Sequence, residues 1–369
     1  MIIYTGALLW MLLIYLYKYD GIIAFDEMQE ASKLEAFLVM FPLVFFIGLR
    51  SRGADTTTYI SSYNLLPVGF KVAIHTLLDF SKRETLFEAY GIFMKTIFGS
   101  NYTPYLFGIA AGSGYAITKV LRRYSDAFFT STILFMLWGT WAWMFNGIRQ
   151  FWAVSITFLG LRFIDEDKPV QYLIIVLIAS RIHATALLMI PIYFIVRGNP
   201  WELKTLVTII FAISIILSSN HFLGILVTAM EGMDYGNILT SEYFINDNGS
   251  HPIRTVLYSI PTVLAFMERE TIKNCGSGII KICVNMSIIC VCFSAIANVT
   301  SGLYFGRLPI YFSIYNMILL PWIFCHTDVR EQKGWIPAIM ILYTAFYIYE
   351  HYFYGFYRYT SEILHLILE

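Results

Sequence analysis

The sequence predicts an all-α integral membrane protein with about eleven transmembrane helices, within a range of roughly ten to twelve. Of the 369 residues, 58% are hydrophobic and only 14% are charged, whereas soluble domains carry about 25% charged residues. The mean hydropathy is +0.64. The apolar residues gather in runs whose lengths are close to the ~20 residues that a membrane-spanning helix needs. These observations exclude a water-soluble enzyme, a nucleic-acid-binding protein and a disordered chain.

The apolar runs follow one another along the whole chain, with polar segments between them. The predicted spans are residues 2–17, 34–49, 102–121, 126–145, 147–164, 170–196, 205–227, 254–267, 279–297, 305–325 and 335–350. No repeat, low-complexity tract or linker divides them, so we expect residues 1–369 to form a single polytopic membrane domain. No basic residue precedes the first run and no A-x-A site follows it, so we expect a retained helix rather than a cleaved signal peptide.

The basic residues predict which side of the membrane each loop faces. If Arg50 leaves the second span on the outer side, 14 of the 25 basic residues fall in inside loops. Those 14 comprise eight Lys and six Arg, whereas the outer 11 comprise three Lys and eight Arg. Because guanidinium groups bind phosphate and carboxylate bidentately, an Arg-rich outer face indicates ligand binding. Residues 50–101 and 228–253 then form two outer loops.

This orientation requires two irregular features. Within residues 50–101, paired apolar residues predict amphipathic helices that lie on the membrane or on the bundle. Residues 170–196 become two half-length segments that turn near Arg181 and His183, because a single span there would invert every later loop. The alternative is one tilted helix that is kinked at Pro191.

The first polar cluster follows the second span as GLRSRGADTTTY, residues 48–59. Guanidinium groups at Arg50 and Arg52, with a flexible glycine between them and Asp55, fit a phosphate-binding turn. Asp55 would then orient an arginine or act as a base, and Tyr59 offers a ring for stacking on a sugar. The alternative is that both arginine side chains only extend to the membrane–water interface, where their charges meet water, and that Asp55 caps the next helix.

The second cluster is NGIRQ, residues 146–150, in a tight outer hairpin that follows three tryptophans. Arg149 and Gln150 point into a closely packed bundle, where a charge without a function would be costly, and Asn146 adds an amide. We therefore expect these three residues to bind substrate or take part in the reaction. The tryptophans are typical of an interfacial aromatic belt, although indole faces also stack on sugars.

The third cluster is Arg181-Ile182-His183, at the predicted break in the helix. Histidine is the side chain best placed to exchange a proton near neutral pH. A histidine in a membrane protein is often only a structural hydrogen-bond partner, so both interpretations stay open for His183.

Single arginines mark several later outer helix ends: Arg254, Arg307 and Arg358. Each of them alone is a weak signal. Burying six or more arginines on one side without an anion would cost several kcal/mol, and a polyanion held in a cavity would remove that cost.

The sequence lacks the motifs of several other enzyme classes. It has no GxxxxGK[ST], GxGxxG, HExxH or GxSxG pattern. Glu231, Asp234 and Glu242 are too loosely spaced to indicate a divalent-metal site. The five cysteines lie in or beside apolar runs, which favours neither a disulfide framework nor a zinc site. We therefore expect no metal and no cofactor.

Four patterns point to a known family: GLR…GxDT…Y at residues 48–59, NxIRQ at residues 146–150, IAS…HxTAL at residues 178–187, and an arginine-led aromatic helix that begins at Arg307. With these patterns the chain resembles the EpsG family of bacterial exopolysaccharide proteins, part of the wider Wzy-type group of O-antigen and capsule polymerases. The resemblance runs over most of the chain. The family usually has a hydrophobic or aromatic residue before its histidine-containing step, so Arg181 is a departure from the pattern.

The resemblance implies a metal-independent, GT-C-like glycosyltransferase of the bacterial inner membrane, with its active site facing the periplasm. Its implied partners are an undecaprenyl-pyrophosphate-linked oligosaccharide donor, a lipid-linked acceptor, membrane lipid and a chain-length regulator, with no nucleic acid. Arg50 and Arg149, with Arg254 or Arg307, would clamp the donor pyrophosphate. His183 or Asp55 would take the proton of the acceptor hydroxyl. The other expected substrate-binding residues are Arg52, Tyr59, Asn146, Gln150, Arg181 and Arg358.

Three other functions remain open at this stage. An O-antigen-type ligase of the same fold would use the same donor with a different acceptor, and the sequence does not separate it from a polymerase. A transporter or flippase for the lipid-linked sugar predicts inverted repeats and charges in both halves of the membrane. A structural subunit of a synthase complex predicts that replacing Arg50 or Arg149 leaves the polymer unchanged.

Overall fold

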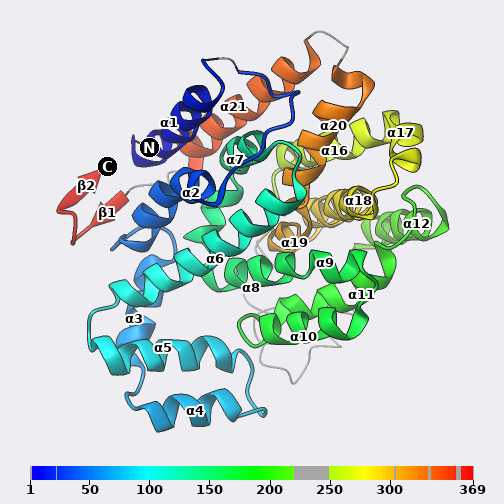
Figure 1. Ribbon diagram of the computed structural model, residues 1–369. Helices are drawn as coiled ribbons and strands as arrows, with labels where there is room; N and C mark the ends of the chain where they lie inside the picture. Colours follow the sequence, from blue (N-terminus) through cyan, green and yellow to red (C-terminus); the bar gives the residue numbers. More distant parts are fainter. Residues whose placement is uncertain are drawn as a thin grey trace. The chain divides into compact units, whose positions relative to one another are not determined.

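The computed structural model describes residues 2–21, 23–219, 249–302, 305–330, 334–354 and 359–368. These residues are helical nearly throughout, which confirms the all-α prediction and fits a membrane protein (Figure 1). The chain divides into two compact units. Unit 1 comprises Met1–Ile190 and Leu320–Glu369, and unit 2 comprises Pro191–Leu319. Arg358 and most of the predicted loop at residues 228–253 lie outside the described residues.

Unit 1 holds most of the helices. They are α1 (Ile2–Lys18), α2 (Lys33–Gly48), α3 (Thr56–Leu65), α4 (Phe70–Leu78), α5 (Thr85–Phe98), α6 (Thr103–Tyr124), α7 (Phe128–Leu137), η1 (Thr140–Met144), α8 (Ile148–Leu159), α9 (Leu161–Asp165), α10 (Pro169–Ser180), η2 (Ala184–Leu188), η4 (Asp328–Arg330) and α21 (Trp335–Tyr354). A short hairpin of β1 (Tyr359–Ser361) and β2 (Leu366–Leu368) follows them.

Unit 2 is built around one long apolar helix. Its helices are α12 (Leu203–Leu217), α16 (Pro252–Met267), α17 (Arg269–Asn274), α18 (Gly278–Val299), η3 (Phe305–Arg307) and α19 (Ile310–Ser313). Two further helices, α11 (Met189–Ile195) and α20 (Asn316–His326), pass from one unit to the other. Hydroxyl and amide groups join α18 to its neighbours, as in the pairs Thr255–Ser294 at 2.7 Å and Thr205–Asn285 at 3.1 Å. Such bonds hold apolar helices together where burial of side chains discriminates little between partners.

The predicted number of full membrane spans is not confirmed. Among the described residues, α18 is long and apolar enough to cross a membrane, and the pair Phe305–Ser313 and Asn316–His326 would add one span if its 46° bend lies within a single crossing. Other apolar helices have only 10–17 residues. Predicted span 126–145 is divided between α7 and η1 at Gly139, where φ is +76°. The apolar runs therefore predicted where helices form better than how long they are.

The predicted break near Arg181 and His183 is confirmed. Helix α10 ends at Ser180, His183 is extended with φ −149° and ψ 121°, and η2 begins at Ala184. Pro191, the alternative position for a kink, lies inside α11.

The predicted helices within residues 50–101 are also present, as α3, α4 and α5. Helices α4 and α5 pack against each other (Figure 1). Phe87 and Ile92 of α5 face the interior, whereas Phe70 and Leu78 of α4 are exposed. Whether α4 lies on a membrane surface stays a prediction.

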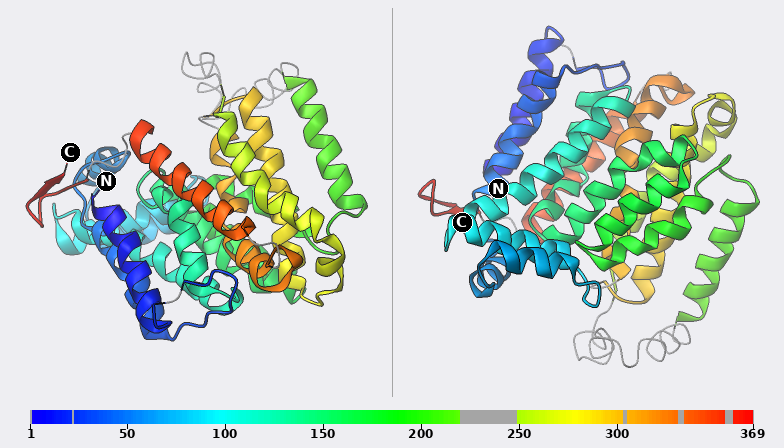
Figure 2. Two further views of the ribbon diagram at one scale, coloured as in Figure 1. Left: turned by 90° about the horizontal axis from the view of Figure 1, so that it is seen from above. Right: turned by 60° about the horizontal axis from the view of Figure 1, so that its bottom comes forward.

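The centre of unit 1 is a layer in which α2, α6 and α8 lie side by side (Figures 1 and 2). Helices α2 and α6 run antiparallel, since Gly48 at the end of α2 meets Phe107 near the start of α6. A Cβ atom on Gly48 would lie 2.5 Å from the Phe107 ring and 2.9 Å from its Cα atom. A Cβ atom on Gly114 would similarly lie 2.4 Å from Val44. The glycines thus allow the two helix backbones to approach closely.

The C-terminal hairpin closes over the turn that follows α2. The Ser51 amide donates to the Thr360 carbonyl at 2.7 Å, and the Ser361 hydroxyl donates to the Leu49 carbonyl at 2.6 Å. The Tyr359 ring lies edge-on to Phe46, with 5.9 Å between the centroids. The hairpin therefore fixes the backbone on both sides of Arg50.

We predict that G48A destabilises the protein. The new methyl group would overlap Phe107, and overpacking of this kind costs about 1–3 kcal/mol. Thermal unfolding in detergent micelles should show a midpoint several degrees lower. The matched control is G6A in α1, where a Cβ atom would meet nothing within 4 Å and the helix should tolerate or favour alanine. Equal midpoints for the two variants would contradict the close packing of α2 on α6.

Candidate functional site

A single carboxylate joins three distant segments of unit 1. Glu84 Oε2 lies 2.8 Å from Arg149 Nη1, and Glu84 Oε1 lies 2.7 Å from His183 Nδ1. The same Oε1 atom accepts a hydrogen bond of 3.0 Å from the Ala184 amide. The side chains of Glu84 and His183 are 13% and 17% exposed, whereas that of Arg149 is 37% exposed. We call Glu84, Arg149 and His183 the Glu84 cluster.

The backbone at each of these positions is specialised. Glu84 precedes α5 in the left-handed region with φ +57°, which a residue with a side chain rarely adopts. The Leu86 amide, two residues further on, donates to the Arg181 carbonyl at 2.9 Å. His183 stands in the extended break between α10 and η2, so the amide of its neighbour Ala184 also faces Glu84. These contacts place the strained residue directly against the broken helix.

The cluster fixes the charge of Glu84. Burial raises the pKa of this carboxyl. The hydrogen bond with His183 and the charge of Arg149 lower the pKa by more than burial raises it, so it lies below the ordinary 4.5. Glu84 is therefore an anion at neutral pH and can only accept hydrogen bonds. It follows that His183 donates from Nδ1, which leaves Nε2 facing away from Glu84.

Arg181 ties the broken helix to the α4–α5 connection. Its Nη2 atom donates to the carbonyls of Leu77 at 2.7 Å and Asp79 at 3.2 Å. Its guanidinium also lies over the Phe80 ring, 4.5 Å from the centroid. These contacts give Arg181 a structural task beside the Glu84 cluster, and its expected role in substrate binding stays a prediction.

Arg50 is almost fully enclosed, at 1% exposure. Its Nε atom donates to the Thr56 hydroxyl at 2.7 Å, Nη1 donates to the Ile47 carbonyl, and the guanidinium lies 5.6 Å from the Phe145 ring centroid. Within the described part of the chain, its buried Nη2 atom has no hydrogen-bond partner. Burial lowers the pKa of Arg50 to about 10, so the group still carries its charge at neutral pH.

Asp55 connects the Arg50 turn to the helix that carries Arg149. Its Oδ2 atom accepts from the Gly147 amide at 2.7 Å, immediately before α8. Asp55 stands at the start of α3 but makes no side-chain cap there. Asp55 thus occupies the N-cap position of α3, as the alternative has it, but its carboxylate accepts from the residue before α8 rather than from α3.

Aromatic rings continue this connection toward the Glu84 cluster. Tyr59 lies edge-on to Phe87, with 6.0 Å between the centroids, and Phe87 lies 5.7 Å from the Arg149 guanidinium. Residues 50–59 and the Glu84 cluster thus belong to one continuous set of contacts within unit 1.

The other predicted residues are more scattered. Gln150 is buried in α8, Asn146 is half-buried just before it, and Arg52 is exposed and pairs through its backbone with Thr360. Arg254 and Arg307 are half-buried in unit 2. Both lie near the C-terminal end of α18, because the Ser250 amide donates to the Ala297 carbonyl and the Gly306 amide donates to the Ser301 carbonyl.

Glu84, the centre of the cluster, is not among the site residues that the sequence predicts. A signal was available, because a half-enclosed arginine and a histidine beside a helix break need a carboxylate. Residues 50–101 contain four of them: Asp55, Asp79, Glu84 and Glu88. Spacing alone does not say which of the four turns toward residues 149 and 183.

No metal centre is evident in the part of the chain that the structure describes. There, no three His, Cys, Asp or Glu side chains lie close enough together to hold an ion. The absence of a metal in the reaction stays a prediction.

A comparison with protein families decides the relationship that the motifs suggest. The EpsG family model matches residues 33–361, from the first residue of α2 to the last residue of β1. The chain belongs to the EpsG family. EpsG is a family of Wzy-like polymerases in polysaccharide biosynthesis. The match includes the whole Glu84 cluster, the Arg50 turn and unit 2. No curated protein and no solved structure matches this EpsG-family chain.

The pKa of Glu84 predicts how the stability of the EpsG-family protein depends on pH. Because the folded pKa is lowered, the stabilisation is complete above the ordinary pKa near 4.5 and is lost as pH falls through the folded value. We expect E84Q to lower the free energy of unfolding by about 1–2 kcal/mol at pH 7, after allowance for the exposure of Arg149. The difference between wild type and E84Q should narrow below pH 4.5.

Unfolding midpoints measured from pH 3 to pH 7 check this prediction. The control is E88Q, one turn further along α5, which should change the midpoint less at pH 7 because Glu88 forms no ion pair among the described residues. An E84Q effect that is the same at all pH values would contradict the charged cluster.

Proposed function

We propose that this EpsG-family protein is a polysaccharide polymerase that works on lipid-linked sugars. It transfers glycan from an undecaprenyl-pyrophosphate donor to a sugar hydroxyl of a second lipid-linked repeat unit. The reaction takes place on the outer side of the bacterial inner membrane. Family membership supports the reaction class, and the Glu84 cluster supports the assignment of residues.

The pairing of His183 with Glu84 carries the assignment of the base. An anionic Glu84 holds the Nδ1 proton, so Nε2 has a lone pair that can accept the proton of a hydroxyl. When His183 becomes an imidazolium, the same carboxylate stabilises its new charge. Asp55, the other candidate base, already accepts a hydrogen bond from the Gly147 amide, which makes it the weaker candidate.

Arg149, which is paired with Glu84, and Arg50 each have a donor to spare for an anion. Arg149 uses Nη1 on Glu84, whereas its buried Nε atom has no hydrogen-bond partner among the described residues. Arg50 likewise has a buried and unpaired Nη2 atom. Buried guanidinium donors without acceptors are costly, and a pyrophosphate would satisfy them. We therefore assign Arg149 and Arg50 to the donor pyrophosphate.

The glycosyl transfer needs no reactant besides the donor and the acceptor. The acceptor hydroxyl oxygen forms a bond to the anomeric carbon of the donor while its proton passes to His183 Nε2. The bond between that carbon and the pyrophosphate oxygen breaks, and undecaprenyl pyrophosphate leaves with the electron pair. The positive charges of Arg149 and Arg50 stabilise the charge that develops on the leaving group.

We also assign Arg254 and Arg307, which lie in unit 2, to contacts with a lipid-linked substrate. They share one end of α18, so that end of unit 2 is the expected place for a second anionic group. Tyr59, which lies edge-on to the buried Phe87 ring beside Arg149, offers a ring to the sugar.

The test is an assay of the purified protein with a synthetic lipid-linked repeat unit. Wild type should produce a ladder of longer lipid-linked glycans, and the ladder should persist in EDTA. H183A and R149A should each reduce the rate by at least 100-fold, because the base and one stabilising charge are lost. Products are counted by gel electrophoresis and mass spectrometry.

Matched control variants separate chemistry from folding. H75A removes an exposed histidine of α4, and R123A removes an exposed arginine at the end of α6. Both should keep wild-type rates. Folded H183A and R149A proteins that still produce the full ladder would contradict the residue assignment. A single addition to a different acceptor would indicate a ligase, and transport without any bond formation would indicate a flippase.

A further inference from the structure

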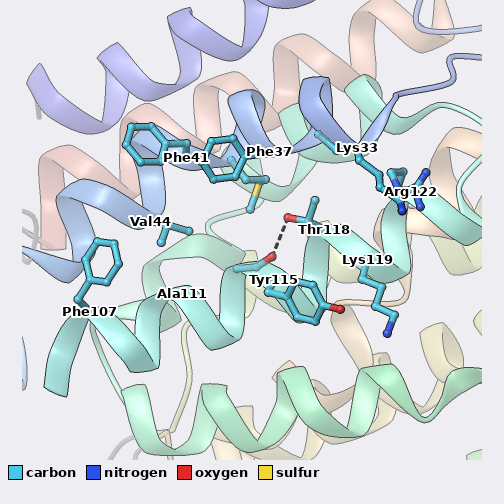
Figure 3. Close-up of a pocket in the computed structure, with 13 residues that line it drawn as sticks. Lys33, Phe37, Phe41, Val44, Phe107, Ala111, Tyr115, Thr118, Lys119 and Arg122 are labelled. Carbon is cyan, nitrogen blue, oxygen red and sulfur yellow. Dashed lines mark hydrogen bonds between the residues drawn. The ribbon is translucent and has the colours of Figure 1, made fainter. Parts of the chain in front are cut away.

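An apolar groove lies between α2 and α6 of unit 1, and none of the residues of the Glu84 cluster lines it. Figure 3 shows residues that line the groove, and the volume of the groove is about 780 Å³. Its lining includes small residues, Ala36, Ala111 and Gly114, which make room between the two helices. Aromatic side chains line it as well: Phe37, Phe41, Phe107 and Tyr115. Phe37 and Tyr115 are 56% and 64% exposed, so the apolar surface is open to its surroundings.

The groove is positively charged at one end. Lys33 is the first residue of α2, and Lys119 and Arg122 lie in the last two turns of α6. Figure 3 shows Lys33 and Arg122 beside each other at one end of the groove, with Phe107 toward the other end. All three cationic residues are exposed.

No carboxylate neutralises these charges within the described ranges of the chain. The nearby Glu35 is already engaged, because its Oε2 atom lies 2.9 Å from Lys18 Nζ and accepts from the Ser32 amide at 2.7 Å. Lys119 lies over the Tyr115 ring, 5.5 Å from the centroid, which leaves its ammonium donors available. Three uncompensated cations beside an exposed apolar groove call for a ligand with one anionic end and a long apolar body.

We propose that this groove binds an anionic phospholipid. Its phosphate lies against Lys33, Lys119 and Arg122, and an acyl chain runs between α2 and α6 toward Phe107. Basic pockets between helices recognise acidic lipid headgroups in this way, through charge at the interface and apolar contact below it. Under the proposed orientation of the chain, this lipid belongs to the cytoplasmic leaflet.

The position of the cationic end of the groove distinguishes this lipid from the polyprenyl donor. Arg50 follows the C-terminal end of α2, whereas the cationic end of the groove is at Lys33, where α2 begins. The 16 residues of α2 place these ends about 24 Å apart. A donor with its tail in the groove and its pyrophosphate on Lys33 would hold its reactive group far from Arg50.

The test is lipid retention by the purified protein in native mass spectrometry, with phosphatidylglycerol and phosphatidylcholine as matched probes. We expect at least a tenfold preference for phosphatidylglycerol. The K33Q/K119Q/R122Q variant should lose this preference, and A111F, which fills the groove, should retain at least fivefold less of the lipid. The control K168Q/K273Q/R123Q removes three other exposed charges and should behave as wild type.

A second measurement needs no variant. Phosphatidylglycerol with a photoactivatable group on its acyl chain should label peptides of α2 and α6 in the wild-type protein. The proposal would be overturned if the wild-type protein retained phosphatidylcholine as well as phosphatidylglycerol. It would also be overturned if the control variant lost as much of the lipid preference as K33Q/K119Q/R122Q, or if the photolabel were confined to other helices. Displacement of the labelled lipid by an equimolar amount of undecaprenyl phosphate would also overturn it, in favour of the donor. The first three results leave the polymerase proposal unaffected, whereas displacement by undecaprenyl phosphate would also move the donor away from Arg50.

Discussion

The ion pair and hydrogen bond made by Glu84 organise the part of unit 1 that holds the candidate site. A carboxylate in a strained backbone position faces a guanidinium on α8 and an imidazole in the break after α10. Because a partly enclosed charge is costly without its partner, the three segments stabilise one another's conformations. The same arrangement determines which nitrogen of His183 carries its proton. The positions of these three segments and the protonated nitrogen of His183 thus depend on the same contacts of Glu84.

Around this interaction, polar contacts connect helices that are otherwise apolar. Asp55 fixes the start of α8, Arg181 fixes the α4–α5 connection, and the C-terminal hairpin fixes the turn of Arg50. Each contact joins residues far apart in the sequence. In apolar surroundings such bonds specify which segments meet, since packing of similar aliphatic side chains discriminates little. Among the described residues, one buried donor of Arg50 and one of Arg149 have no hydrogen-bond partner, and the hydroxyls of Ser51 and Thr85 beside them have none either.

Much of this arrangement could be predicted from the sequence, and the limits have physical causes. Helix positions, the break at Arg181 and His183, and the helices of residues 50–101 follow from hydropathy and from the positions of basic residues. Helix lengths do not, because turns at Gly139 and Gly160 lie inside apolar runs. Glu84 escaped prediction because its role arises from a long-range contact that leaves no periodic signal. Arg254 and Arg307 share one end of unit 2, which a pattern of single arginines could only suggest.

A double-mutant cycle measures the energetic coupling between Glu84 and its partners directly. E84Q, R149Q and the double variant would be unfolded by denaturant in mixed micelles at pH 7. We expect the double variant to lose less stability than the sum of the single losses, by about 1 kcal/mol or more. Losses that add within about 0.3–0.5 kcal/mol would contradict the account, because Glu84 and Arg149 would then not depend on each other.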